Sequence, residues 1–173
     1  MFQKKKDTLL PTDVADTPAL SVDTRLPNPP ILTCNEPIPL RILVKKTNDT
    51  TQSIYMQMLQ IELISYTHIR AHNLQRTQVG SWVIFSGSNM SMLLGRGSDP
   101  VGTEWTIPSP LWDNIPLPNT VAPSFEICNI SRTYELEVRV GFVHGSGGTM
   151  KVKCGLIIII FGFVSPFFVD MCD

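Results

Sequence analysis

Two groups of residues have types and spacings that resemble chemical sites, and each has a simpler explanation. His68 and His72 are four residues apart, which on a helix would place both imidazoles on one face, as in some zinc sites. No third ligand lies near them in the sequence, so we interpret them as solvated or core-capping histidines. Residues 95–98, Gly-Arg-Gly-Ser, resemble a phosphate-binding loop but lack its lysine and a following helix start, which predicts a plain turn.

The remaining candidates also favour structural roles. Glu135 and Glu137 alternate with apolar residues, so they are predicted on the wet face of a strand and not as an acid–base couple. The tryptophans are interpreted as core and corner packing, and the asparagines of three N-x-S/T sequons as turn residues. These residues are Trp82, Trp105, Trp112, Asn48, Asn89 and Asn129. No serine-hydrolase, P-loop or zinc-protease motif occurs, so we predict no enzyme, no catalytic residue, no cofactor and no metal site.

The composition describes one globular domain in a reducing compartment. The 173 residues are 43% hydrophobic and 17% charged, with a net charge of −1 and scattered basic residues, which argues against nucleic acid as a partner. The start of the chain has a basic trio without an apolar run, so it is not a secretory signal. Four widely spaced cysteines exclude the usual zinc and redox spacings and indicate reduced thiols in a cytoplasmic protein.

The clearest structural element is a strand predicted over residues 134–142. Its alternate residues are apolar, namely Tyr134, Leu136, Val138, Val140 and Phe142, and the residues between them are mostly charged. Only a strand places every second side chain on one face, so this segment is a half-buried strand with one wet side.

Short apolar runs between the fourteen prolines indicate further strands. They are expected at 39–44, 54–69, 82–85, 90–94, 103–107 and 150–154. Residues 54–66 leave a helix as the competing interpretation, and their apolar phase changes midway, which predicts a β-bulge near 58–59. Residues 68–80 are expected to form a loop or a short helical turn. The pattern predicts an all-β antiparallel sandwich over residues 31–154, preceded by a flexible, proline-rich leader over 1–30.

Three stretches carry a family resemblance. Residues 34–44 read CNEPIPLRILV, residues 80–84 read GSWVI, and residues 116–140 run from IPLPNTVAPSF to YELEVRV. In this order they resemble fungal arrestin-like proteins of the α-arrestin type, and in particular the second, C-terminal lobe of the arrestin fold, over about residues 30–145. The resemblance implies an immunoglobulin-like sandwich. It also implies a cytosolic adaptor that recognises membrane-protein cargo and links it to a ubiquitin ligase and to endocytosis.

The chain departs from this family in two ways. An arrestin needs two sandwiches of roughly 100 residues each, and a leader of 30 residues cannot supply the first. No P-P-x-Y motif for recruiting a ligase is present. We therefore expect one truncated lobe, with its partner-binding residues unknown.

The C-terminal tail, residues 155–173, changes character abruptly. Its residues 155–169 form a nearly unbroken apolar run, shorter than the roughly 20 residues that span a membrane as a helix. Three interpretations stay open. The run is a membrane anchor, which would give a tail-anchored protein or weak membrane association; it is a buried last strand with an overhang; or residues 149–173 are translated intron or frameshifted sequence.

Overall fold

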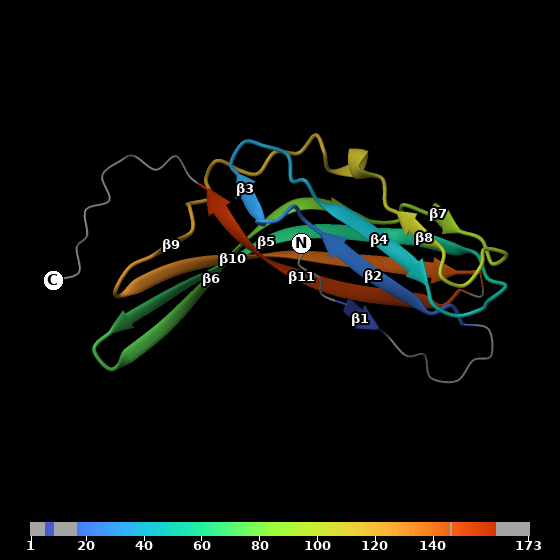
Figure 1. Ribbon diagram of the computed structural model, residues 1–173, viewed down its shortest axis with the longest axis horizontal. Helices are drawn as coiled ribbons and strands as arrows, with labels where there is room; N and C mark the ends of the chain where they lie inside the picture. Colours follow the sequence, from blue (N-terminus) through green and yellow to red (C-terminus); the bar gives the residue numbers. More distant parts are fainter. Residues whose placement is uncertain (1–5, 9–16, 146, 162–173) are drawn as a thin grey trace.

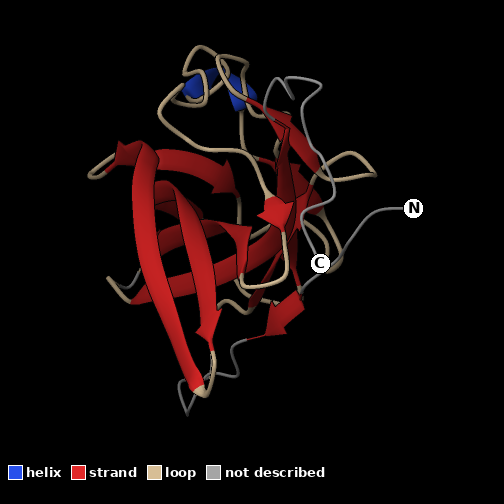
Figure 2. Cartoon of the chain, turned by 90° about the vertical axis from the view of Figure 1, so that its left-hand side faces the viewer, coloured by secondary structure: helices blue, strands red, loops and turns tan. Residues whose placement is uncertain are grey.

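The computed structural model describes residues 6–8, 17–145 and 147–161, and almost all of its regular structure is β-strand (Figures 1 and 2). Two sheets face each other. The smaller has the order β1-β2-β4-β8, and the larger has the order β3-β11-β10-β5-β6, with β7 paired to β5 and β9 paired to β10. The prediction of an all-β sandwich is confirmed. Its pairing is antiparallel except between β11 and β3, which run parallel.

The strands differ greatly in length. The smaller sheet contains β1 (Lys6–Thr8), β2 (Leu20–Arg25), β4 (Arg41–Lys46) and β8 (Glu104–Thr106). The larger contains β3 (Ile31–Thr33), β5 (Ile54–Ala71), β6 (Leu74–Gly87), β7 (Met92–Gly95), β9 (Phe125–Glu126), β10 (Ile130–His144) and β11 (Thr149–Phe161). A 3₁₀ turn, Ser109–Leu111, interrupts the proline-spaced crossing between the sheets.

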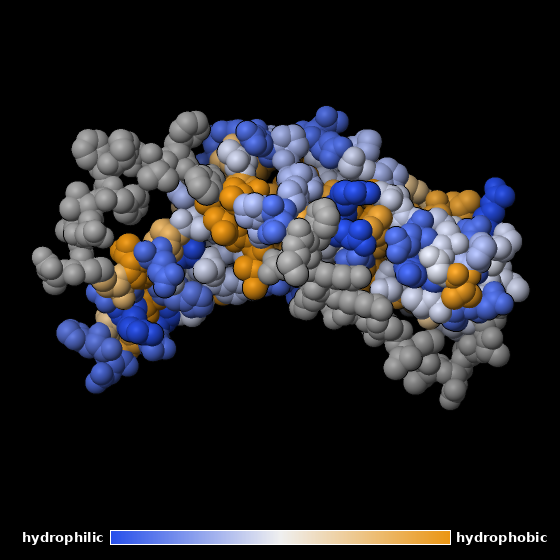
Figure 3. All heavy atoms as spheres, viewed as in Figure 1, coloured by the Kyte–Doolittle hydropathy of each residue, from blue (hydrophilic) through white to orange (hydrophobic). Residues whose placement is uncertain are grey.

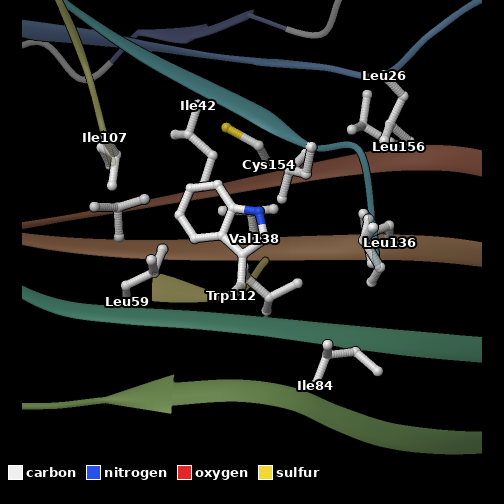
Figure 4. Close-up of a cluster of buried hydrophobic side chains, with 14 of the residues drawn as sticks. Leu26, Ile42, Leu59, Ile84, Ile107, Trp112, Leu136, Val138, Cys154 and Leu156 are labelled. Carbon is white, nitrogen blue, oxygen red and sulfur yellow. The ribbon is translucent and has the colours of Figure 1, made fainter. Parts of the chain in front are cut away.

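The core lies between the inner faces of the two sheets (Figure 4). The five alternating apolar residues predicted for β10 are each at most 1% exposed, which confirms the buried face of this strand. Trp112, from the crossing, fills the space beside them and is 1% exposed. Burying a large apolar side chain contributes about 1.5–3 kcal/mol, so this layer is the main source of stability.

The phase change in β5 is a bulge, as predicted. Phe142 pairs with Met56 and Gly141 with Met58, so Gln57 is an extra residue between them. The insertion moves the buried side of the strand from Met56 to Leu59, and both of these side chains are fully buried. The interpretation of residues 54–66 as a helix is wrong.

The sandwich begins earlier than expected. β2 lies inside residues 1–30, where a flexible leader is predicted, and its Leu20 and Val22 are 3% and 0% exposed. Its polar Ser21 and Thr24 are also buried, which is why the segment reads as polar and aperiodic. The prediction is wrong for residues 20–25, while residues 1–5 and 9–16 lie outside the described part of the chain.

The sandwich also ends later than residue 154. β11 includes the first part of the apolar tail, and Leu156, Ile158 and Ile160 are at most 3% exposed. Thus residues 155–161 form a last strand with one buried face, while Ile157 and Ile159 on its other face are exposed, and the membrane-anchor interpretation is wrong for them. The interpretation of residues 149–173 as translated intron or frameshifted sequence stays a prediction, and residues 162–173 lie outside the described range. Within the described range, no helix is long and apolar enough to cross a membrane.

Candidate interaction surface

The β5–β6 hairpin continues beyond the sandwich as an arm, which we define as residues 67–78 (Figure 1). Its pairing is unbroken out to Ala71 opposite Leu74, and His72 and Asn73 form the turn. His72 has a φ of 51°, as short hairpin loops require. The prediction of a loop or short helical turn over 68–80 is therefore wrong. The arm was missed because residues 68–79 are all exposed, so neither face has an apolar alternation.

The start of β10 supports one side of the arm. Ile130 pairs with Ile69 in the sheet. Arg132 donates from Nε to the Thr67 hydroxyl at 2.9 Å, and its guanidinium lies 5.8 Å from the centre of the Phe125 ring. These contacts hold the base of the arm against the β9–β10 turn.

A hollow of about 450 Å³ lies between the arm and the β9–β10 turn. It is lined by residues 68–70 and 75–77 of the arm and by residues 126–131. This volume is in the range of sites that hold a small molecule or a few side chains of a partner. The hollow contains Arg70, Arg76 and His68 on the arm side and one acidic residue, Glu126, on the other.

The arm is basic and its cations are accessible. It carries Arg70, Arg76, His68 and His72 and no acidic residue. Among the described residues, neither Arg70 nor Arg76 forms an ion pair. Figure 3 shows hydrophilic and hydrophobic side chains mixed at this end of the molecule, and the exposed apolar residues there include Leu74 at 77% and Ile127 at 50%. Guanidinium groups beside apolar side chains suit a protein partner with carboxylates or phosphates.

The two histidines do not form a zinc site. They lie on a strand and a turn, and His68 Nδ1 is 3.0 Å from the Thr77 hydroxyl. In the described ranges no three His, Cys, Asp or Glu residues are grouped to hold a metal ion. Residues 96–99 form a turn, as predicted, directly after Gly95 ends β7. The Arg96 amide donates to the Asp99 carboxylate at 2.8 Å, and the Gly97 carbonyl accepts from Lys46.

The tryptophans and the sequon asparagines have the structural roles that were predicted. Trp112 is buried, Trp105 packs against the core, and the Trp82 ring lies 6.4 Å from that of Tyr134. The Asn48 side chain accepts from the Ala19 amide at 2.6 Å and donates to the Thr17 carbonyl at 2.8 Å.

The outer face of β10 is not uniformly wet, which corrects the prediction for Glu137. This residue is 2% exposed and forms ion pairs with Arg139 and with Lys153 of β11, the latter at 2.6 Å. Glu62 lies opposite Glu137 in the register and shares Arg139, at 3.4 Å. Long cationic side chains thus cover the carboxylate. Their arrangement depends on strand neighbours that the sequence around Glu137 does not reveal.

Glu135 has a different partner. Its Oε2 accepts a hydrogen bond from the Tyr66 hydroxyl at 3.1 Å. Burial, followed by this hydrogen bond and the carboxylate charge, raises the pKa of Tyr66. The phenol therefore stays protonated as a donor, and the pair is structural.

The cysteines differ from one another. Cys34 and Cys154 are thiols, and the Cys34 Sγ donates to the Val121 carbonyl at 3.4 Å. Cys128, which lines the hollow beside the arm, is disulfide-bonded. The expectation of reduced thiols is wrong at this position.

Comparison with protein-family models gives no match for this chain, and comparison with curated proteins gives none either.

Proposed function

We propose that the chain is a non-enzymatic, arrestin-like interaction module that recognises membrane-protein cargo from the cytoplasm and links it to a ubiquitin ligase and endocytosis. Three sequence stretches in the order found in arrestin-like proteins support the proposal, with the immunoglobulin-like sandwich that they imply. The observed two-sheet architecture is compatible with that expectation.

The arm is the observation that carries the proposal. A hairpin that extends beyond the core gains little stability from burial, so its length needs another explanation. Its accessible Arg70 and Arg76 suit an anionic partner surface. The cytoplasmic side of a membrane is negatively charged, and cargo proteins emerge there, so a basic arm is attracted to the place where cargo is found.

Site-specific photo-crosslinking tests the proposal in cells. A photo-reactive residue at Gln75 on the arm should capture membrane proteins and a ubiquitin ligase. The same residue at Val101, which is also exposed but lies at the other end of the sandwich, should capture far less of both. Equal capture from the two positions, or no membrane protein from Gln75, would contradict the proposed role.

Charge removal tests the same surface. The double variant Arg70→Gln/Arg76→Gln should lose capture of cargo, because it removes both accessible guanidinium groups of the arm. The matched control, Arg41→Gln/Arg96→Gln, removes two exposed arginines elsewhere and should keep it. Equal losses in the two variants would show that only net charge matters.

A further inference from the structure

β6 is a long strand with an open edge in the larger sheet. The other strands at the margins of the sheets, β1, β3, β7, β8 and β9, have two to four residues each, whereas β6 has fourteen. Very short edge strands are a common defence against unwanted pairing with other chains. Among the described strands, β6 lacks this protection, and so does β11, whose residues 149–158 pair with β10 alone because β3 covers only residues 159–161. β11 still lies against β1 and β2, whereas β6 has no comparable neighbour besides β5.

The backbone of β6 is free to pair on its outer side. β6 is hydrogen-bonded only to β5, and its residues make no other backbone hydrogen bond with the described part of the chain. The strand also lacks the residues that usually block an edge, since it contains no proline, lysine, aspartate or glutamate. One bulge limits it, because Val83 and Phe85 pair with consecutive residues of β5 and leave Ile84 between them.

We propose that the β6 edge pairs antiparallel with β6 of a second copy of this chain, so that the larger sheets of two copies join into one. A two-fold axis perpendicular to the sheet turns an edge strand onto an antiparallel copy of itself. The unbulged part of the strand runs from Leu74 to Val83. A ladder centred on Val79 pairs residues 75–83 of the two copies, leaves out only Leu74 of this part, and places Val79 against Val79 of the second copy.

The side chains of β6 fit this register. Val79 is 59% exposed, and on the axis it is covered by its own copy as a β-branched cross-strand pair. Arg76 lies three residues from the axis on one side and Trp82 three residues on the other, so each Arg76 faces Trp82 of the second copy, a favourable cation–aromatic pair. The two Arg76 residues are then six positions apart, about 20 Å along the strand, and do not repel each other strongly.

The charges of the two copies are compatible with the antiparallel arrangement. Gln75, the partner of Arg70, faces Val83 of the second copy, the partner of Glu62, so Arg70 of one copy and Glu62 of the other lie on the same face of the joined sheet. The inference goes beyond the proposed cargo role and does not depend on it.

Sedimentation of the purified chain tests the inference. We expect a dimer, with twice the 19.3 kDa mass of one chain, in reversible equilibrium with monomer. Val79→Lys should raise the dissociation constant at least about tenfold, since it replaces an apolar pair on the axis by two like charges. Val101→Lys is the matched control, because Val101 is 53% exposed in a turn and should leave the equilibrium unchanged. A wild-type chain that stays monomeric at millimolar concentration, or equal effects of the two lysines, would overturn the proposal.

Disulfide trapping tests the register. Under mild oxidation Val79→Cys should form a crosslinked dimer, because cross-strand Cβ atoms lie about 4.5–5.5 Å apart. Gln78→Cys faces the other side and pairs with residue 80 of the copy, so it should crosslink no more than the wild type under the same conditions. Crosslinking of both variants to the same extent indicates random collision and contradicts the two-fold pairing. Cargo capture by the Val79→Lys monomer would leave the proposed function standing even where the dimer fails.

Discussion

Figure 1 shows the two ends of the sandwich, the arm end and the opposite end, where β4 stops. Both ends carry cations, and the protein uses them in opposite ways. At the end away from the arm, Lys46 is fully buried. Its ammonium donates to the carbonyl oxygens of Thr50, Gly97 and Asp99 at 3.2, 2.7 and 2.7 Å. At the arm end, Arg70 is exposed and forms no ion pair with the described residues.

The comparison assigns a stabilising role to the buried cation and a binding role to the exposed ones. A buried ammonium with three acceptors fixes two loops to the end of β4, and it is inaccessible to a partner. An exposed guanidinium contributes little to folding and keeps its donors available. We therefore expect changes at the Lys46 end to lower stability without a direct effect on binding, and changes in the arm to do the reverse.

The largest expected effect is a difference in the free energy of unfolding between substitutions in the buried base of the β5–β6 hairpin and in its arm. Leu63→Ala removes a fully buried side chain and should lower the free energy of unfolding by about 2–5 kcal/mol. Leu74→Ala, in the same hairpin but 77% exposed, should change it by less than about 0.5 kcal/mol. Urea denaturation measures both. A large loss from Leu74→Ala would mean that the arm is part of the folding core.

The next effect tests the buried cation. Lys46→Met keeps most of the aliphatic chain and removes the ammonium, so three carbonyl oxygens lose a charged donor. We expect a loss of about 3 kcal/mol in the same denaturation experiment. The control is the neighbouring Lys45→Met. The Lys45 side chain is half-exposed and its Nζ lies 3.8 Å from Glu104 Oε1, so this substitution should lower the free energy of unfolding by less than about 0.5 kcal/mol. Similar values for the two variants would show that the carbonyls are rehydrated at little cost.

The sequence predicts the elements in which local pattern and burial agree. β10 is an example, because its alternating apolar residues all face the core. β2 was missed because polar Asp23 and Thr24 are buried within it, and the Asp23 carboxylate pairs with Arg25 at 2.7 Å, which hides the apolar pattern. Turn chemistry around residues 95–98 was predictable, since it depends on neighbours in the chain.

The candidate site was harder to predict than the fold. The arm has two wet faces, so its strands lack the apolar alternation that reveals a half-buried strand. The burial of Glu137 depends on Lys153, which is distant in the sequence and adjacent only through the β10–β11 register. The open edge of β6 follows from the strand order, which local sequence does not specify.

The next prediction concerns the pH dependence of stability that the buried Tyr134 should produce. Tyr134 is 1% exposed, and its hydroxyl donates to the Ala122 carbonyl at 2.5 Å. Burial raises the pKa of Tyr134 above its ordinary value of 10.0. The unfolded chain therefore loses the proton first, so the stabilising contribution is complete below pH 10 and is lost as the pH rises through the folded-state pKa. Above pH 10, the free energy of unfolding should fall more steeply for the wild type than for Tyr134→Phe. If the free energy of unfolding fell equally with pH in the wild type and in Tyr134→Phe, Tyr134 would not be the source of the pH dependence.

The smallest expected effect concerns the tip of the arm. It tests whether a change there leaves the Lys46 end of the sandwich unaffected. His72 occupies a left-handed conformation, with a φ of 51°, that costs a non-glycine residue about 1 kcal/mol. His72→Gly relieves this cost, and the greater backbone entropy of glycine in the open arm offsets most of the relief. We therefore expect the closed arm to gain less than about 0.5 kcal/mol. Amide hydrogen exchange should slow for the arm, residues 67–78, and stay unchanged around Lys46. Ala71→Gly is the control, because residue 71 lies in the strand and the same replacement there should speed exchange in the arm. If His72→Gly also changed exchange around Lys46, the two ends would be coupled, and stability and binding would not be separable in this fold.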